Sequence, residues 1–430
     1  MGKNVIIVGG GVAGLAASIY LAKAGKTVTI FEKKRQLGGR AITHLRHGYR
    51  FNLGPHAVYR RGASATVYRD LGIALRGGTP KARGLALYGG ERYRLPAGPF
   101  SLFFSGLLGM KAKFEAARVL FRLGRIDAKP YAGMTAREWL MSYIRDERLR
   151  ELLEAYIRLA TYTNAPGELS AEAALTQLRL VLGGVMYVDE GWQKIVDALH
   201  SHAVTAGVNF ITSSRVVRVD HDSRVRGIEL GGLELEDRND TMSVALPEIP
   251  PEGVQGTRLP ADVVLLAVDP DTVEELVGDA MPSAASPVVA ACLDVALSTL
   301  PVKETTFALG IDQPLYFSVH SAWAQLTPRG GALLHAMKYR GDGTAPASEH
   351  ELELLLDQLQ PGWRDLVVHR RYLPAMVVSN ALHKPRTPRP TPETPIRGLY
   401  VAGDWVGEQG MLSDAALSSA RAAAQAIIAE

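Results

Sequence analysis

The fold is decided by the N-terminal stretch VIIVGGGVAGLAA, residues 5–17. It opens with an all-apolar, β-branched run, which is typical of a buried parallel strand. Glycines in the spacing GxGxxG follow, then a helical pattern that ends at Gly25, and then a second apolar run at residues 27–31. Strand, glycine turn, helix and strand in this order predict a βαβ unit.

The glycines of this turn predict a nucleotide site. Gly9 permits the tight turn, Gly11 lets the backbone approach a pyrophosphate, and Gly14 lets the helix pack closely on the strand. Val12 and Ala13 lie at the start of the helix, where backbone N–H groups point toward the phosphates. The motif alone also fits a glycine-rich turn that binds nothing, so other residues of the βαβ unit are needed to distinguish a nucleotide site from such a turn.

The acidic residue at the end of the second strand decides in favour of a dinucleotide. Glu32 stands 18 residues after Gly14, and a carboxylate at that point accepts hydrogen bonds from a ribose diol. The same negative charge would repel a 2′-phosphate, which argues against NADP.

Composition sets broad limits on the function. The 430 residues are 47% hydrophobic and 21% charged, as in a globular chain of two or three domains. A net charge of +4, without a run of five Lys or Arg, gives no reason to expect a nucleic-acid partner. Cys292 is the only cysteine, which excludes an internal disulfide framework and CxxC motifs. We expect Cys292 in the core, and we expect no metal site.

The apolar segments do not predict export or a membrane span. The N-terminal run lacks the basic region and cleavage site of a signal peptide. No uncharged apolar run reaches the roughly 18 residues that a spanning helix needs. We therefore expect a cytoplasmic protein.

Nucleotide-fold character occurs in three separate parts of the chain, with other material inserted between them. We predict a nucleotide-binding domain formed by residues 1–75, 185–285 and 373–430. A second domain combines residues 76–184, which are mainly helical, with the strand-rich residues 286–372. The two domains are thus expected to be interleaved along the chain.

The segment EKKRQLGGR, which starts at Glu32, narrows the ligand. Here the chain begins to resemble the flavoprotein superfamily of phytoene desaturases, protoporphyrinogen oxidases and monoamine oxidases. In that family the acid binds the adenosine ribose, and the GGR segment runs beside the pyrophosphate and ribityl chain of FAD. The resemblance implies FAD contacts from Glu32, Lys33, Lys34, Gly38, Gly39 and Arg40.

Two further segments carry the same resemblance. FNLGPHAV resembles the family segment near the isoalloxazine ring and implies contacts from Gly54, Pro55 and His56. Asn52 stands where the family usually has an acid. VNFITSSRVVRV resembles the segment in which a backbone valine holds adenine, and the best match is Val216.

The C-terminal stretch LYVAGDWVGEQGMLSDAALSSARAAA resembles the last FAD signature of the family. Gly403 and Asp404 match the Gly-Asp pair that meets the ribityl chain and pyrophosphate. Met411 and Leu412 are then expected at the pyrimidine edge of the flavin, and Ala415 is a further expected cofactor contact. The positive end of the final helix would face that edge and stabilise the anionic reduced flavin.

Departures from the monoamine oxidases count against an amine substrate. Those enzymes have a tyrosine where Met411 stands, and a lysine in a strand resembling PVVAACLDVAL, where Ala290 stands. The C-terminal motif has no cysteine. FAD is therefore expected to bind non-covalently.

The resemblance implies an α/β fold in which a Rossmann-like FAD-binding domain of the glutathione-reductase type is interleaved with an α+β substrate-binding domain. No second GxGxxG follows a strand. We therefore expect the organic substrate itself to reduce the flavin, with oxygen or a quinone as the electron acceptor.

Residues 96–125 bear on the substrate. An uncharged apolar cluster that includes Phe103 and Phe104 precedes five basic residues and a single acid, Glu115. Such a segment can lie on an anionic bilayer surface, or it can form a core helix with a solvated basic face. In the family a similarly placed helical segment draws lipophilic substrates from membranes. Peripheral contact with the inner face of the membrane therefore stays open beside the core interpretation.

The combined expectation is an FAD-dependent dehydrogenase of a lipophilic, isoprenoid or carotenoid-like substrate. The alternatives are a protoporphyrinogen oxidase or flavin amine oxidase, a carotenoid isomerase, and a flavoprotein without turnover. The candidate catalytic residues are His56, Gln409 and Met411, although His56 is equally well a flavin contact or a satisfied buried histidine. Trp192 and Trp405 are further candidates for the pocket wall. The oligomeric state stays open.

Overall fold

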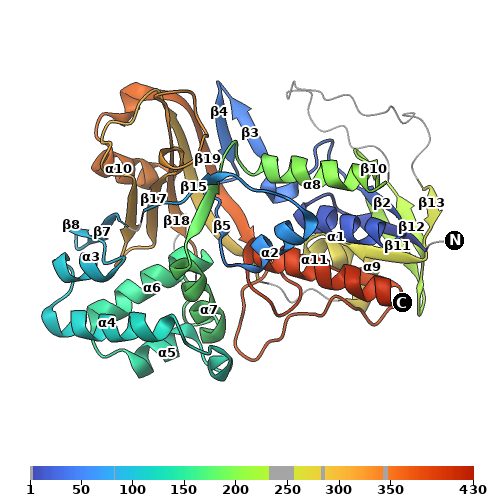
Figure 1. Ribbon diagram of the computed structural model, residues 1–430, viewed down its shortest axis with the longest axis horizontal. Coiled ribbons are helices and arrows are strands. Elements are labelled where there is room, and N and C mark those ends of the chain that lie inside the picture. The colour runs from blue at the N-terminus through green and yellow to red at the C-terminus, as the bar shows by residue number, and fades with distance from the viewer. Residues whose placement is uncertain (1–2, 82, 232–255, 282–285, 342–346) are drawn as a thin grey trace.

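The computed structural model describes residues 3–81, 83–231, 256–281, 286–341 and 347–430. It contains two bodies that lie side by side (Figure 1). One is built on a parallel sheet and the other on a mixed sheet, and the chain passes between them several times. The predicted α/β fold with interleaved domains is therefore confirmed, while the residue limits given for each domain stay a prediction.

The first body contains a five-stranded sheet in which every neighbouring pair is parallel. The predicted βαβ unit forms its centre. The strand order across the sheet is β10 (Asn209–Ile211), β2 (Thr27–Phe31), β1 (Asn4–Val8), β14 (Val263–Leu266) and β20 (Leu399–Val401).

Layers cover both faces of this sheet because its strands present apolar side chains to both sides. Val5 and Ile7 face a helical layer, whereas Ile6 and Val8 face the opposite side. The helical layer consists of α1 (Val12–Lys23), α2 (Ala63–Leu71), α8 (Gln193–Thr205) and α11 (Leu412–Ala429). The opposite layer consists of the antiparallel strands β11 (Val216–His221), β12 (Val225–Leu230) and β13 (Arg258–Pro260) with helix α9 (Pro270–Val277).

The second body contains a seven-stranded mixed sheet, in which only the β16–β7 pair is parallel. The strand order is β19 (Val367–Ser379), β15 (Val288–Leu297), β18 (Ala332–Tyr339), β17 (Leu315–Val319), β16 (Phe307–Gly310), β7 (Leu85–Tyr88) and β8 (Glu91–Arg94). The second half of strand β19 also lines the cavity that is described in the next subsection.

Helices cover both faces of this mixed sheet as well. Helix α10 (Glu349–Leu359) packs on one face. The other face meets a helical group formed by α3 (Pro99–Phe104), α4 (Met110–Leu123), α5 (Ala136–Tyr143), α6 (Glu147–Thr161) and α7 (Ala171–Leu182). The helical character predicted for residues 76–184 is thus present. No helix among the described residues is long and apolar enough to cross a membrane.

Short strands join the two bodies. The hairpin of β3 (Thr43–Arg46) and β4 (Tyr49–Asn52) leads into the loop that contains His56. Strand β9 (Val185–Val188) pairs with both β5 (Val58–Tyr59) and β6 (Gly77–Gly78).

Candidate functional site

A cavity of about 920 Å³ lies at the carboxyl ends of the parallel strands, against strand β19 of the second body. Ligands bind at this end of the sheet in open α/β folds. The wall is formed by the glycine turn after β1, the end of β2, the loop after β14, the start of β11, the end of β19 and the start of α11.

The glycine turn is shaped for a close ligand. Gly9 has a φ of +105°, and a Cβ atom there would lie 2.6 Å from the carbonyl oxygen of Ala267. A Cβ atom on Gly14 would overlap the carbonyl oxygen of Gly9. At Gly11, by contrast, the position of a Cβ atom has no described atom within 4 Å, and the residue lines the cavity. Protein atoms thus occupy the space beside Gly9 and Gly14, whereas the space beside Gly11 is open to a pyrophosphate.

Glu32 occupies the position at which the sequence predicts a ribose contact. Its Oε2 atom accepts a hydrogen bond from the Gly10 amide at 2.8 Å, and its Oε1 atom accepts one from the Lys34 amide at 2.9 Å. These bonds fix the carboxylate at the cavity wall, and its remaining lone pairs can accept hydrogen bonds from the hydroxyls of a ribose. Lys33 and Val216 also line the cavity.

Asp404 organises a charged section of the wall. The Arg40 guanidinium lies 2.9 Å from Asp404 Oδ2, and Asn380 donates to both carboxylate oxygens, through its backbone amide at 3.1 Å and its side-chain amide at 3.0 Å. Arg40 also donates to the carbonyl of Val378 at 3.0 Å. Because Asp404 is buried, these bonds hold Arg40 at the wall, where its charge suits a pyrophosphate.

Arg389 supports this section from behind, and sequence reasoning missed it. Its guanidinium donates to the carbonyl of Asp404 at 3.3 Å and to the carbonyl of Gly410 at 2.9 Å. Burial lowers the pKa of Arg389 to about 10. The residue thereby ties together both ends of the loop that precedes α11. It lies in the proline-rich connector, whose pattern predicts only extended chain.

His56 forms part of another section of the wall, together with Trp192, Tyr162 and Met376. The rings of His56 and Trp192 meet edge to face, with centroids 4.8 Å apart. Burial lowers the pKa of His56 to about 4, so the imidazole is neutral at neutral pH. Its Nδ1 atom lies 3.1 Å from the Gly54 carbonyl. In the tautomer with the proton on Nδ1, the ring donates a hydrogen bond to this carbonyl.

Asn52 replaces the usual acid of the family segment without facing the cavity. Its Oδ1 atom accepts hydrogen bonds from the Thr43 hydroxyl at 2.6 Å and from the Trp192 amide at 3.0 Å. The side chain therefore fixes the start of the segment that contains Trp192.

Most residues predicted to hold the cofactor are brought together at the cavity wall. They are Gly9, Gly11, Val12, Ala13, Glu32, Lys33, Lys34, Gly38, Gly39, Arg40, Pro55, His56, Val216, Gly403, Asp404 and Leu412. Leu412 has a φ of +57°, a left-handed conformation that branched side chains rarely adopt and that is often found at functional sites.

The remaining predicted residues lie beside the cavity. Gly14 and Ala415 are buried in helices, and Gly54 lies behind Met376. Gln409 is exposed on the loop before α11, and Met411 is buried against the helical group of the second body. Trp405 packs on the opposite side of the parallel sheet and donates to the carbonyl of Val268 at 2.9 Å. The structure does not bring these side chains to the wall.

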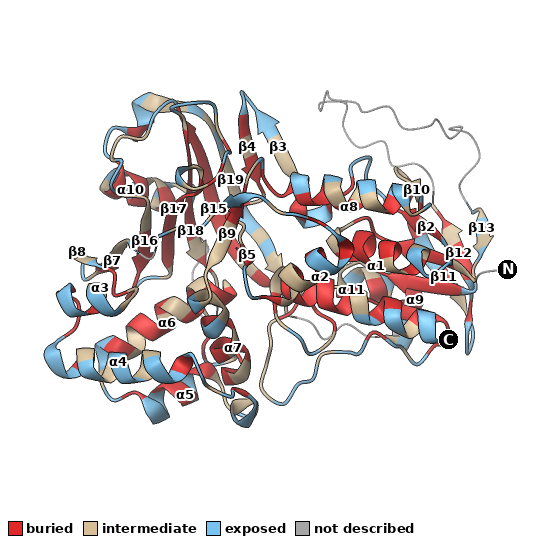
Figure 2. Cartoon of the chain, viewed as in Figure 1, coloured by how far each residue is buried: buried red, intermediate tan, exposed pale blue. Residues whose placement is uncertain are grey.

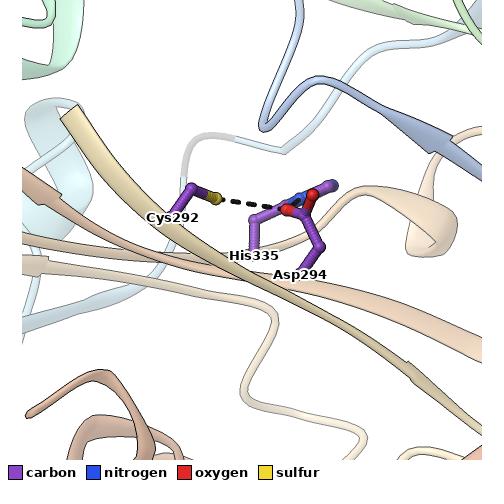
Figure 3. A group of neighbouring side chains, drawn as sticks. All are labelled: Cys292, Asp294 and His335. Carbon is purple, nitrogen blue, oxygen red and sulfur yellow. Dashed lines mark hydrogen bonds and ion pairs between the residues drawn. The ribbon is translucent and has the colours of Figure 1, made fainter. Parts of the chain in front are cut away.

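Behind the wall, the second sheet holds a buried polar cluster that sequence reasoning did not find (Figure 3). Asp294 Oδ1 lies 2.7 Å from His335 Nδ1 and 3.1 Å from Cys292 Sγ, and Arg371 lies 2.5 Å from Asp294 Oδ2. Arg371 also donates to the Asn52 carbonyl. Burial raises the pKa of Asp294, but His335 and Arg371 outweigh that effect and hold it below its usual value. Cys, Asp and His can bind metals, but Arg371 already balances this carboxylate. We therefore interpret the cluster as an ion pair.

The fold and the cavity define a dinucleotide-binding protein of the Rossmann-like class. Residues 12–295, about two-thirds of the chain, match the profile of flavin-containing amine oxidoreductases, and the chain belongs to this family. Its cofactor is FAD. The open glycine turn, the ribose acid and the Arg40–Asp404 pair provide a site that fits this cofactor.

Curated relatives cover only parts of the chain. It is 26% identical to a phytoene desaturase of Fusarium fujikuroi over 314 residues, which are 62% of this chain and 49% of the desaturase. It is 36% identical to the protoporphyrinogen oxidase of Bos taurus over 132 residues, which are 25% of this chain and 28% of that protein. The chain thus spans about half the length of the phytoene desaturase.

Solved structures share the fold over the whole chain. An oxidoreductase from Methanosarcina mazei has a TM-score of 0.73 at 18% identity and covers 99% of this chain and 100% of its own. Wild-type putrescine oxidase bound to putrescine has a TM-score of 0.71 at 18% identity, with 100% of both chains covered. At this identity the likeness shows the fold alone.

Proposed function

We propose that the chain is an FAD-dependent oxidoreductase that dehydrogenates a lipophilic substrate, with an isoprenoid or carotenoid-like polyene as the first candidate. Family membership and the match to a phytoene desaturase support this proposal. The observation that carries the lipophilic part is an aromatic surface on the second body.

We define this aromatic surface by five exposed phenylalanines of α3 and α4: Phe100, Phe103, Phe104, Phe114 and Phe121. Figure 2 shows exposed residues along both helices. Leu102 and Leu107 point into the core instead, so a core role explains only part of the apolar segment. The rings of Phe100, Phe103 and Phe104 contact one another at the surface. Soluble proteins rarely leave contiguous apolar side chains in water unless they meet a partner or a membrane.

Basic side chains follow the aromatic surface along α4 and just beyond its end. They are Lys111, Lys113, Arg118, Arg122 and Arg125. Lys113 also donates to the carbonyl of Phe103 at 2.8 Å and so links α3 to α4. Aromatic rings that insert at the headgroup level, beside cations that attract anionic lipids, suit a peripheral membrane contact. Such a contact would give the enzyme access to a membrane-dissolved substrate.

FAD, when bound, supplies the chemistry by accepting a hydride from the substrate. The chain supplies binding and orientation. Because the pKa of His56 is about 4, its imidazole is a poor proton acceptor near neutral pH. We therefore assign His56 an orienting role beside Trp192, and we expect the substrate proton to leave to solvent.

A protoporphyrinogen oxidase is the second candidate, because the match to the bovine enzyme has the higher identity over a shorter stretch. An amine oxidase has less support. Met411 is buried away from the cavity wall, and Ala290, which stands where monoamine oxidases have a lysine, is a buried residue of β15 opposite Met376.

Anaerobic rapid mixing tests the proposal. The FAD-loaded protein is mixed with a polyene in anionic vesicles, with a porphyrinogen, or with an amine, and loss of the oxidised flavin absorbance is followed. We expect rapid reduction by the polyene. Reduction by the porphyrinogen alone would transfer the proposal to the second candidate, and no reduction by any of the three would contradict dehydrogenation. Isomerisation of a polyene by the prereduced protein, without net oxidation, would identify an isomerase. Reoxidation by oxygen or by a quinone then defines the acceptor.

A further inference from the structure

Asp414 is a buried carboxylate in the first turn of α11, and none of the predicted contacts accounts for it. Leu412, Ser413 and Ala416, in the same turn, line the cavity. The side chain of Asp414 turns toward α2 instead. Its charge therefore lies at the positive end of the helix that faces the cofactor.

The surrounding backbone is shaped to hold this carboxylate. Asp414 Oδ1 accepts hydrogen bonds from the Ser64 amide at 2.8 Å and from the Ser64 hydroxyl at 2.5 Å. A Cβ atom on Gly62 would overlap the carboxylate, and one on Gly410 would lie 2.7 Å from Asp414 Cβ. Two neighbouring segments thus leave room for an acid at this point.

No cationic side chain of the described residues pairs with Asp414, so its charge, when it is ionised, is met only by hydrogen bonds and by the helix end. Tyr68 of α2 and Tyr59 of β5 face it. Burial is the main cause that raises the pKa of both phenols, Tyr162 adds to the rise at Tyr59, and the nearby carboxylate adds to both, so they stay neutral. Arg421, further along α11, pairs with Asp70. Among the described residues, no Lys, Arg or His forms an ion pair with Asp414.

Opposing effects set the protonation of this carboxylate. Burial raises the pKa of Asp414, and hydrogen bonds from Ser64 and from the Ala63 backbone partly offset the rise. An ionised carboxylate in a first turn offsets the partial positive charge of the helix end, whereas a protonated one leaves that charge in place. The field that α11 directs at the cavity therefore depends on one proton.

We propose that Asp414 is an electrostatic positioning residue for FAD: when ionised it offsets the positive end of α11 and disfavours the reduced cofactor, and when protonated it restores that end. The proposal goes beyond the proposed function, because it needs only bound FAD and no particular substrate.

The midpoint potential of bound FAD, measured against pH with photoreduction and indicator dyes, tests this proposal. Asp414→Asn keeps the shape and the acceptor oxygen but removes the charge. At pH 8 we expect the ratio of reduced to oxidised FAD at a fixed potential to rise about fivefold, as expected for one charge at a helix end. The difference should vanish at acid pH. Asp70→Asn is the matched control, because it removes a carboxylate that joins the same two helices, and it should superimpose on the wild type.

Identical curves for Asp414→Asn and the wild type would overturn the proposal, as would an equal shift in Asp70→Asn. If Asp414→Asn does not fold, Ser64→Ala provides the second test. This variant keeps the carboxylate and removes one of its hydrogen-bond donors. The plot of midpoint potential against pH should change slope where Asp414 titrates, and in Ser64→Ala this change of slope should lie at higher pH than in the wild type. A change of slope at the same pH would count against Asp414. Because no substrate is added, a failure of the lipophilic-substrate proposal leaves this result readable.

Discussion

The exposed fraction of two phenylalanines in the aromatic surface sets how far their substitution should weaken binding to a membrane. Phe103 and Phe104 are 62% and 56% exposed. Full burial of a phenylalanine side chain contributes roughly 2 kcal/mol, so inserting the exposed part of each ring into a bilayer contributes about 1.2 kcal/mol. The double substitution Phe103→Ser with Phe104→Ser should therefore weaken partition into vesicles by about 2.4 kcal/mol, which is roughly 60-fold.

Vesicle flotation measures this change. The wild type, the double variant and a control are mixed with anionic vesicles over a range of lipid concentrations, and the bound fraction is compared. Leu354→Ser is the control, because Leu354 is an exposed apolar residue on α10, away from α3 and α4. Thermal melts should agree for all three proteins, since the substituted side chains are exposed. Equal flotation of the double variant and the wild type would refute the membrane interpretation, and so would an equal loss in the control.

Three further predictions concern the cofactor site and the buried cluster. Gly14→Ala should abolish FAD retention on purification, because the added Cβ atom overlaps the Gly9 carbonyl oxygen and pushes α1 away from β1; full flavin content would contradict this. Asp404→Ala should raise the Kd for FAD by at least about tenfold, because the buried carboxylate that holds Arg40 is lost, and fluorescence titration of the apoprotein checks it. Asp294→Asn should lower the free energy of unfolding by about 3 kcal/mol at neutral pH. Because the folded state holds the pKa of Asp294 below its usual value, this stabilisation is present above the unfolded pKa and is lost as the pH falls, so denaturant curves at acid pH should converge.

Local motifs made much of the cavity wall predictable. Gly9, Gly11 and Glu32 lie within one βαβ unit, where chain order alone sets their geometry. Asp404 is almost four hundred residues away, but its Gly-Asp signature comes just after a buried strand, and parallel strands bring such ends to one edge.

Side chains that depend on tertiary pairing were not predictable. Asp294, His335 and Arg371 come together because β18 and β19 pair with β15 in a register that no local pattern specifies. Arg389 lies in an extended connector without periodicity. Asp414 falls inside the recognised C-terminal signature, yet its burial against Ser64 depends on how α2 packs on α11.

The apolar segment of α3 and α4 shows a different limit. Its composition fits both a core helix and a membrane contact, and the structure contains elements of both, since Leu102 is buried while Phe103 is exposed. The spacing of apolar residues along a helix does not tell whether an apolar face is buried in the core or is exposed for contact with a partner or a membrane.

We propose that a lipophilic substrate, rather than a nicotinamide cofactor, delivers electrons to the FAD of this chain. Anaerobic mixing of the FAD-loaded protein with NADH, with NADPH, and with a polyene in anionic vesicles tests it most directly. We expect fast loss of the oxidised flavin absorbance with the polyene and none above the buffer control with either nicotinamide. Fast reduction by NADH or NADPH, with no reduction by the polyene, would contradict it.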